Sequence, residues 1–336
     1  MASEENLIER ISRAIAGKGT KRNFSRNQRL RLGIGDDAAV ISINSRSDWV
    51  LSCDASLEDT HFLANTYPAD SIGYKSLVRA TSDLAAMGAR PRFFLLTLAL
   101  PEERAGKWLD QFLRGMRRAA RLMGIELIGG DTTRYLAISI SITVIGETLP
   151  GVAARRSGAR PGDILYVSGG LGKAHLGLAL MRKGASLKYA RQLQPHLYPK
   201  IPLDLGIWLA DKGIATAMMD ISDGLSTDLY RLCRSSGVGA RIFAQDVPCV
   251  QILPAIARKL KGGNVDPLKM ALNGGEDYAL LFAVPREKTD LLAKAPGASS
   301  LAAIGEVTRE KTVLLVAATG RTYTLNPGGW DPFRKK

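Results

Sequence analysis

Acidic residues in this sequence repeatedly follow short apolar, strand-like runs and adjoin glycine or serine. The clearest case is "GIGDDAAV", where two adjacent aspartates stand on a glycine-flanked turn. The acids in such settings are Asp36, Asp37, Asp54, Asp131, Asp220, Asp223, Glu276 and Asp277. Binding sites are commonly built at strand ends, and clustered carboxylates repel each other unless a cation compensates them. The pattern therefore predicts strands whose ends contribute acids to one site.

Strand-like and helical segments alternate along the chain, which predicts mixed α and β structure in both halves. A continuous apolar run predicts a buried strand at 92–100, and a strictly alternating run predicts a half-buried strand at 136–147. Helical spacing predicts long amphipathic helices at 71–89 and 102–124. Further strand and helix signals lie at 49–62, 125–131, 164–170, 213–224, 225–237, 240–245 and 278–284.

Proline, glycine and arginine collect at residues 149–163, "LPGVAARRSGARPGD". A chain of 336 residues has the usual length of two domains. We therefore expect an N-terminal domain over residues 1–150 and a C-terminal domain over residues 151–336. The first residues read as an amphipathic helix capped at Ser3, and a basic polar stretch follows it.

The composition is that of a folded globular protein, with 46% hydrophobic and 23% charged residues. Lys plus Arg is 46 and Asp plus Glu is 32, so the net charge of +14 favours polyanionic partners or simply solubility. The cysteines Cys53, Cys233 and Cys249 form no paired motif, which argues against disulfides or zinc and favours a cytoplasmic location. No segment approaches the roughly 18 apolar residues that span a bilayer, so we expect no membrane partner.

Oxygen ligands without nearby histidine or cysteine suit Mg²⁺ or Ca²⁺ better than zinc. Mg²⁺ is usually shared between one or two carboxylates and substrate phosphates, so the sequence is consistent with a metal–nucleotide site. The chain has no GxxxxGK[ST] loop, and His175 stands where a dinucleotide turn needs its third glycine. The glycine-rich segment 166–178 could still cradle a phosphate at a helix start.

Each acid also has a plain structural interpretation. Aspartate beside glycine is ordinary turn chemistry, and Asp223 could cap the helix that begins near Leu225. His61 follows Asp54, Glu58 and Asp59 in what the sequence indicates is one loop. For His61 we expect a structural role and a ligand contact about equally.

The ordered motifs resemble those of the thiamine-monophosphate kinase family, from about residue 30 to the tail. They are "GIGDDAAV", "DASLEDTHF", "SDLAAMGA", "IGGDTTR", "RSGARPGD", "MDISDGLSTDL" and "GGEDYALLF". The resemblance implies an α/β fold of two aminoimidazole ribonucleotide synthetase-like domains, in which the N-terminal domains of two copies form a shared β-barrel. It also implies transfer of the γ-phosphoryl group of ATP to thiamine monophosphate in a homodimer.

The resemblance further implies residue roles. The implied Mg²⁺ ligands are Asp37, Ser52, Cys53, Asp54, Asp83, Asp131, Asp220 and Asp223. The implied ATP contacts are Gly130, Asp131, Arg156 and Ser222, and the implied thiamine contacts are His61, Glu276 and Trp330. No general base is expected, because a phosphate monoester is mostly a dianion at neutral pH. Two residues depart from the family pattern: Cys53 stands where Thr or Ser is usual, and Asp59 where Gly is common.

Two alternatives remain at this point. One is another ATP-using enzyme of the same superfamily, acting on a purine precursor, selenide or a maturation protein. The other is a nucleic-acid-binding protein, prompted by the charge of +14. Scattered basic residues and only 6% aromatic residues disfavour nucleic acid as a partner.

Overall fold

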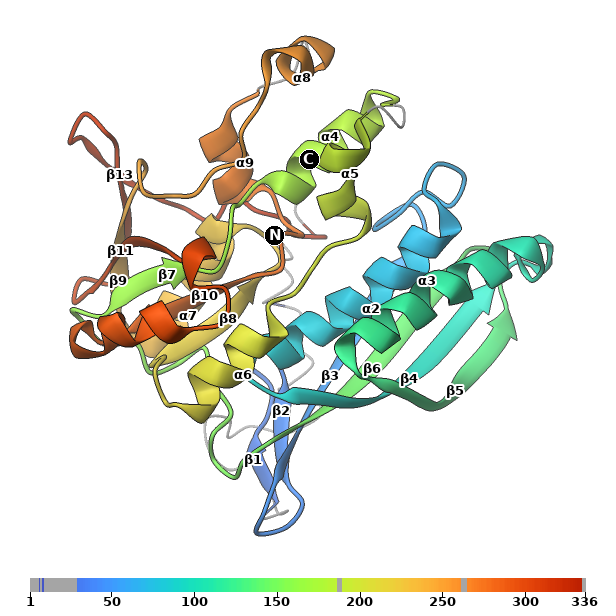
Figure 1. Ribbon diagram of the computed structural model, residues 1–336, viewed down its shortest axis with the longest axis horizontal. Helices are drawn as coiled ribbons and strands as arrows, with labels where there is room; N and C mark the ends of the chain where they lie inside the picture. Colours follow the sequence, from blue (N-terminus) through green and yellow to red (C-terminus); the bar gives the residue numbers. More distant parts are fainter. Residues whose placement is uncertain (1–5, 7, 9–28, 186–188, 261–264, 334–336) are drawn as a thin grey trace.

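The computed structural model describes residues 6, 8, 29–185, 189–260 and 265–333. The helix expected near the N-terminus and most of the basic stretch at 17–31 lie outside the described residues. In the described part the chain forms two mixed sheets with helices packed against them (Figure 1). The predicted mixed α/β fold class is therefore confirmed.

The first sheet has six strands in the order β1-β2-β3-β6-β4-β5. β4 and β5 are parallel, and the other pairs are antiparallel. The strands are β1 (Leu30–Leu32), β2 (Ala39–Ser42), β3 (Asp48–Leu57), β4 (Arg90–Leu100), β5 (Glu126–Arg134) and β6 (Ser139–Thr148). Within one chain this sheet is open, with β1 and β5 at its edges, so the barrel implied by the family resemblance is not closed here.

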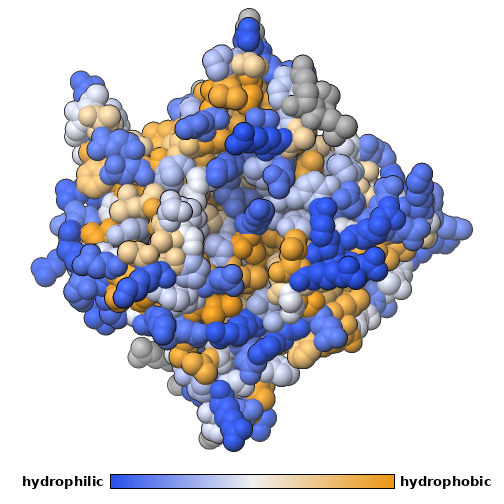
Figure 2. Space-filling view, in the orientation of Figure 1, coloured by the Kyte–Doolittle hydropathy of each residue, from blue (hydrophilic) through white to orange (hydrophobic). Residues whose placement is uncertain are grey.

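Two long helices, α2 (Ala69–Ala86) and α3 (Lys107–Met123), cover one face of this sheet (Figure 1). They pack closely because Gly115 faces the backbone of α2, where an added Cβ would lie 1.7 Å from the Asp70 carbonyl oxygen. The outer face of α3 is hydrophilic, as its amphipathic pattern predicts (Figure 2). The helix expected over 102–124 is interrupted, since a 3₁₀ turn at Glu102–Arg104 precedes α3 and Gly106 is the N-cap residue.

The opposite face of the sheet is not covered by a helix of the described chain. β6 alternates between buried and half-buried residues, as predicted. β4 alternates as well, so the expectation of a wholly buried strand at 92–100 is wrong: its alternate residues face the open side. β5 is exposed at every position. Its Leu127 and Ile128 are 52% and 53% exposed, and Leu136 beyond it is 93% exposed.

The second sheet has seven strands in the order β13-β12-β9-β11-β7-β10-β8. Only β9 and β12 pair in parallel. The strands are β7 (Ile164–Val167), β8 (Ala217–Ile221), β9 (Gly239–Phe243), β10 (Ala279–Val284), β11 (Ala302–Thr308), β12 (Val313–Val316) and β13 (Thr322–Thr324). The helices of this half are α4 (Lys173–Arg182), α5 (Ala190–Leu197), α6 (Leu203–Asp211), α7 (Leu225–Ser236), α8 (Pro254–Lys259) and α9 (Pro267–Asn273), with 3₁₀ turns at Arg286–Lys294 and Ala298–Ser300.

Helix α2 lies where the two halves of the chain meet. Residues 149–163 contain neither helix nor strand and connect the sheets. Ala85 and Ala86 at the end of α2 share a hydrophobic cluster with Leu205 and Leu209 of α6. The C-terminal turns of α2 therefore face the second sheet, next to its edge strand β8. No described helix is both long and apolar enough to cross a membrane.

Candidate active site

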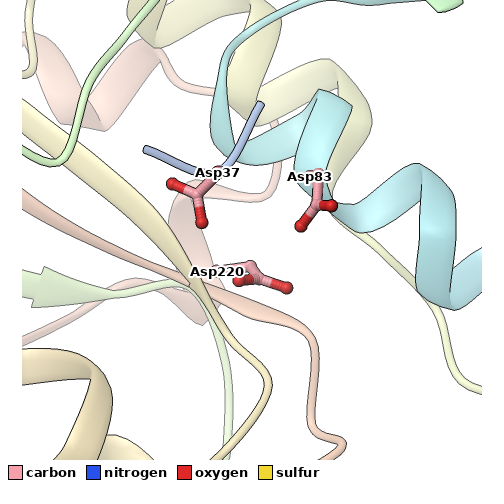
Figure 3. A group of neighbouring side chains, drawn as sticks. All are labelled: Asp37, Asp83 and Asp220. Atoms are coloured by element: carbon pink, nitrogen blue, oxygen red, sulfur yellow. The ribbon is translucent and has the colours of Figure 1, made fainter. Parts of the chain in front are cut away.

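Three carboxylates from distant parts of the sequence converge at this junction. Asp37 precedes β2, Asp83 lies in the last turn of α2, and Asp220 lies on β8. One oxygen from each lies within 4.8 Å of the others. Figure 3 shows the three side chains around a shared space. The structure thus brings together Asp37 and Asp220, which the strand-end pattern singled out, and Asp83, which the family resemblance implied.

The proximity of three carboxylates disfavours their charged forms. Burial, reinforced by the neighbouring carboxylates, raises the pKa of Asp83 well above its ordinary value. Burial and Asp37 raise the pKa of Asp220 to about 7. Hydroxyl groups of Ser52 and Ser82 donate to Asp83 and Asp220 respectively. These two bonds offset only part of the repulsion.

The donor set fits a hard divalent cation. All of its atoms are oxygens, and Asp37 Oδ2 is buried and has no hydrogen-bond partner among the residues that the structure describes. An unpartnered buried carboxylate oxygen is expensive unless a ligand completes it. The chemistry of the site therefore suits Mg²⁺ rather than a soft metal.

The two adjacent aspartates of the "GDD" turn have different roles. The Arg156 guanidinium lies 2.7 Å from Asp37 Oδ1, which brings a positive charge to the edge of the acid cluster. Asp36 accepts the backbone N–H of Arg156 at 3.0 Å instead of joining the cluster. Burial and Asp37 raise the pKa of Asp36 to about 6. Asp36 thus holds the connecting segment, residues 149–163, against this turn.

Strand β3 presents its residues alternately to the two faces of the sheet. Ser52 and Asp54 face α2, where Arg79 Nε lies 2.7 Å from Asp54 Oδ2. Cys53 faces the open side, and its Sγ lies 3.5 Å from Ser141 Oγ of β6. The Cys53 thiol therefore points away from the acid cluster.

The loop after β8 and the C-terminal tail form a second group beside the cluster. Ser222 directly follows the last residue of β8, and its Oγ lies 3.4 Å from Asp220 Oδ1.

Asp223 pairs with Arg231 and does not cap α7, whose N-cap residue is Gly224. Buried Asp228 accepts the N–H groups of Asp223 and Gly224. The tail docks here, since the backbone N–H of Trp330 donates to the backbone carbonyl of Asp223 at 3.0 Å. Trp330 itself is 41% exposed.

A pocket lies beside the first and middle turns of α2, and two of its lining residues, Lys75 and Arg79, share a helix face with Asp83. It is lined by Ser56, His61, Phe62, Tyr67, Ser71, Ile72, Lys75, Ser76, Arg79 and Glu276. Glu276 has a φ of 70°, and its N–H donates to the Ser222 carbonyl at 2.8 Å. A non-glycine residue keeps such a conformation only where the surroundings enforce it. The backbone therefore ties this pocket to the acid cluster.

His61 is a neutral side chain in this pocket. Its Nδ1 accepts the backbone N–H of Leu57 at 3.0 Å, so Nε2 carries the ring hydrogen. Burial, together with Arg79, lowers its pKa to about 4. His61 can therefore donate a hydrogen bond to a ligand without adding charge.

Gly130 and Asp131 lie apart from the cluster. They are on the edge strand β5, and Asp131 is exposed. In the register of the sheet, Asp131 is opposite Thr97, Thr97 opposite Ser141, and Ser141 opposite Ala55 of β3. Three strand spacings of about 4.8 Å separate Asp131 from β3 by about 14 Å. Gly130 also has a packing reason to be glycine, since an added Cβ would lie 1.8 Å from the Leu96 carbonyl oxygen.

Backbone N–H groups of the glycine-rich segment before α4 already donate to a carboxylate of the protein. Asp277 accepts the N–H groups of Gly172 at 2.6 Å and Ala174 at 3.0 Å. Burial raises the pKa of Asp277 to about 6 despite these bonds. A protein carboxylate therefore takes the place of a bound phosphate, and the suggestion of a phosphate cradle at 166–178 is wrong.

Three side chains that line or adjoin the pocket were not identified from the sequence. Lys75 and Arg79 share one face of α2 with Asp83, because residues four apart are neighbours on a helix. Charged residues on the buried face of an otherwise apolar helix are the signal that could have identified them. His196 of α5 enters the same pocket region by packing against Tyr67 and Lys75, and nothing in its local sequence indicates this.

Comparison with known proteins identifies both halves of the chain. Residues 35–148 match the family model of the AIR synthase related protein, N-terminal domain. Residues 160–316 match the model of the AIR synthase related protein, C-terminal domain.

Curated relatives and solved structures extend the similarity over nearly the whole chain. Thiamine-monophosphate kinase of Salmonella typhimurium is 36% identical over 93% of this chain and 96% of that protein. The Escherichia coli K12 enzyme of the same name is 35% identical over 90% of this chain and 92% of its own. A solved structure of AaThiL complexed with AMPPCP and TMP superimposes with a TM-score of 0.83 at 31% identity, covering 98% of this chain and 97% of that chain.

Proposed function

This chain belongs to the thiamine-monophosphate kinase family, and we propose that it transfers the γ-phosphoryl group of ATP to thiamine monophosphate. The observation that carries the proposal is the cluster of buried Asp37, half-buried Asp83 and buried Asp220 beside a pocket that contains His61 and Glu276. The relative solved with AMPPCP and TMP supports the same pair of substrates. We also propose that residues 1–150 and 151–336 are the two domains.

The cluster is the proposed site for several Mg²⁺ ions. Asp37, Asp83 and Asp220 would hold them, with Asp54, Asp223 and Ser52 contributing from the rim. When bound, such ions would neutralise the phosphate oxygens of both substrates and reduce their mutual repulsion. Arg156 would contact ATP with the guanidinium that faces Asp37, and Ser222 would contact ATP from the loop after β8.

The proposed reaction needs alignment more than acid–base chemistry. The acceptor is a phosphate monoester with a second pKa near 6, so at neutral pH its oxygen is already a nucleophile. That oxygen forms a bond to the γ-phosphorus of ATP, in line with the oxygen that bridges the β- and γ-phosphates. The bond from the γ-phosphorus to this bridging oxygen breaks, and the oxygen leaves as part of ADP. The protein's task is to hold two charged phosphates in this geometry.

The acceptor's ring system is proposed to occupy the pocket. His61 would donate from Nε2, and Glu276 would accept from the ring or pair with its charge. Trp330 would cover the ligand from the tail that docks on Asp223. This arrangement places the acceptor's ring beside the first and middle turns of α2 and its phosphate toward the acid cluster at the end of that helix.

We further propose that the open face of the first sheet and strand β5 pack against the same surface of a second copy. An edge strand exposed at every residue, with Leu127 and Ile128 uncovered, is a surface that folded proteins normally pair or protect. Pairing through a two-fold axis would close the two open sheets into the shared barrel that the family resemblance implies.

The dimer proposal makes a direct prediction. Ile128→Lys places a charge in the interface, so the variant should sediment as a monomer at micromolar concentration, whereas the wild type sediments as a dimer. Leu291→Lys is the matched control, because Leu291 is similarly exposed but lies in the second half. Sedimentation velocity measures both, and a monomeric wild type would contradict the proposal.

The function is tested by incubating purified protein with ATP, Mg²⁺ and thiamine monophosphate and separating the products. Thiamine diphosphate and ADP should form in equal amounts. Turnover of a purine precursor with thiamine monophosphate left intact would contradict the proposal and favour another activity of the superfamily.

Cys53 is predicted to be tolerant of substitution. Its thiol points to the open face of β3, away from the acids, so it could meet a metal only through its backbone carbonyl. Cys53→Ser and Cys53→Thr should keep kcat and the Mg²⁺ half-saturation within about three-fold, because both side chains have similar volume. Titrations with Mg²⁺ and Mn²⁺ provide the test. A large, selective gain in Mg²⁺ affinity would instead show that a side-chain hydroxyl at this position is a ligand.

A further inference from the structure

The polar side chains around Glu276 form a chain of contacts outside the acid cluster. Lys75 Nζ lies 2.7 Å from Glu276 Oε1, and His196 Nδ1 lies 3.1 Å from Glu276 Oε2. The other ring nitrogen of His196 lies 2.8 Å from the Tyr67 hydroxyl. Tyr67, Lys75 and His196 are all buried. The contacts join the first half of the chain to helix α5 of the second.

The positions of the protons follow from this geometry. Burial raises the pKa of Tyr67 to about 12, so at neutral pH the phenol keeps its proton and donates it to His196 Nε2. Burial and Lys75 lower the pKa of His196, so the ring is neutral and carries its hydrogen on Nδ1. Lys75 and His196 Nδ1, 3.4 Å apart, are therefore both donors, and both are directed at Glu276.

Two donors on one carboxylate fix both its charge and its orientation. Burial alone would raise the pKa of Glu276, but Lys75 and His196 outweigh it and lower that pKa. A carboxylate has about four lone-pair directions, so two donors leave capacity for a ligand. The Glu276 side chain is 26% exposed and lines the pocket, so this capacity is available to a ligand there.

Resting on the proposed function, we propose that Tyr67, Lys75 and His196 are positioning residues that hold Glu276 as a carboxylate for recognition of a cationic heteroaromatic ring. The thiazolium ring of thiamine carries a permanent positive charge. In a pocket shielded from water, a fixed carboxylate discriminates strongly between a cationic ring and a neutral one. The network therefore determines which acceptor phosphates the enzyme binds.

The test is a matched pair of variants at His196. The amide nitrogen of Asn can reach the position of Nδ1, whereas that of Gln reaches the position of Nε2. His196→Asn therefore keeps a donor to Glu276, and His196→Gln loses it, while both place a polar side chain in the same buried site. We expect the KM for thiamine monophosphate to rise about ten-fold in His196→Gln and to stay within about three-fold in His196→Asn. The KM for ATP and kcat should change by less than about two-fold in either.

Tyr198→Phe is the control for the docking of α5. It removes the 2.9 Å hydrogen bond from Tyr198 to Asp70, directly after α5, and leaves the Glu276 network intact. Its acceptor KM should be unchanged. Equal acceptor KM values in the two His196 variants would overturn the inference, as would losses in kcat or ATP affinity as large as the loss in acceptor affinity.

A binding measurement separates this inference from the proposed reaction. Thiamine, which has the cationic ring but no phosphate, is titrated calorimetrically into the wild type and both variants without ATP. The wild type and His196→Asn should bind it more tightly than His196→Gln. A wild type that produces no thiamine diphosphate would refute the proposed function, whereas equal thiamine affinity in wild type and His196→Gln would refute the inference.

Discussion

Asp83→Asn should lower kcat by about 10³-fold while the protein stays folded. The substitution replaces one carboxylate of the acid cluster, a proposed metal ligand, by a neutral amide of nearly the same shape. The Ser52 hydroxyl can still donate to the amide oxygen, so the local structure should persist. The loss should fall mainly on kcat, because neutralisation of phosphate charge matters most in the transition state.

The control is Asp70→Asn, the same exchange on the same helix but outside the cluster. Asp70 lies at the start of α2, where it accepts a hydrogen bond from Tyr198. The kcat of Asp70→Asn should remain within about two-fold of the wild type, because half-buried Asp70 lies outside the acid cluster and the Asn amide oxygen can still accept the Tyr198 hydrogen bond. Steady-state kinetics measures kcat of both variants, and circular dichroism tests whether both are folded. A folded Asp83→Asn with near-normal kcat would exclude Asp83 as a metal ligand.

The same variant should be more stable than the wild type when metal is removed. Burial and the neighbouring acids raise the folded-state pKa of Asp83 above its ordinary value of 3.8. Above that pH the unfolded chain loses the proton that the folded protein retains, so the stability of the wild type falls as pH rises. Asn carries no such penalty. In a chelator the melting temperature of the variant should exceed that of the wild type at pH 8 but not at pH 4.

The sequence indicated the positions of these acids because their setting is local, while their role as metal ligands stays a prediction. Asp37, Asp83 and Asp220 each stand in a motif with its own turn, helix or strand signal, and the structure brings these three together. Lys75 and His196 were missed because their roles depend on the packing of α5 against α2, which brings together residues 121 positions apart. Local patterns carry no information about such a contact.

Local patterns also cannot show which group accepts the N–H groups of a loop, or whether a strand lies at the edge of its sheet. The loop before α4 has the glycines of a phosphate cradle, but Asp277, which lies 105 residues after Gly172, accepts the loop's N–H groups. Likewise the sequence predicts strand β5 correctly, but only the sheet order reveals that β5 is an edge with both faces exposed. Long-range packing decides both cases.

The position of Asp131 on that edge leads to the second large expected effect. Within one chain Asp131 is exposed and lies three strands from β3, so its carboxylate does not join the acid cluster of its own subunit. The family resemblance implies that Asp131 holds Mg²⁺. We therefore predict that Asp131 does so at the acid cluster of the partner subunit, with β5 packed across the dimer's two-fold axis. Asp131→Asn should then reduce kcat about as strongly as Asp83→Asn, although it removes only a surface carboxylate.

A heterodimer of the two inactive variants distinguishes the subunit that supplies Asp131. One chain carries Asp83→Asn and the other Asp131→Asn, with different affinity tags so that only the mixed dimer is purified. If Asp131 acts across the interface, one site contains both substitutions and the other contains none. The mixed dimer should therefore recover about half of the wild-type turnover, since a two-fold dimer has two equivalent sites. If Asp131 acts within its own subunit, each site keeps one defect and the mixed dimer stays as inactive as either parent.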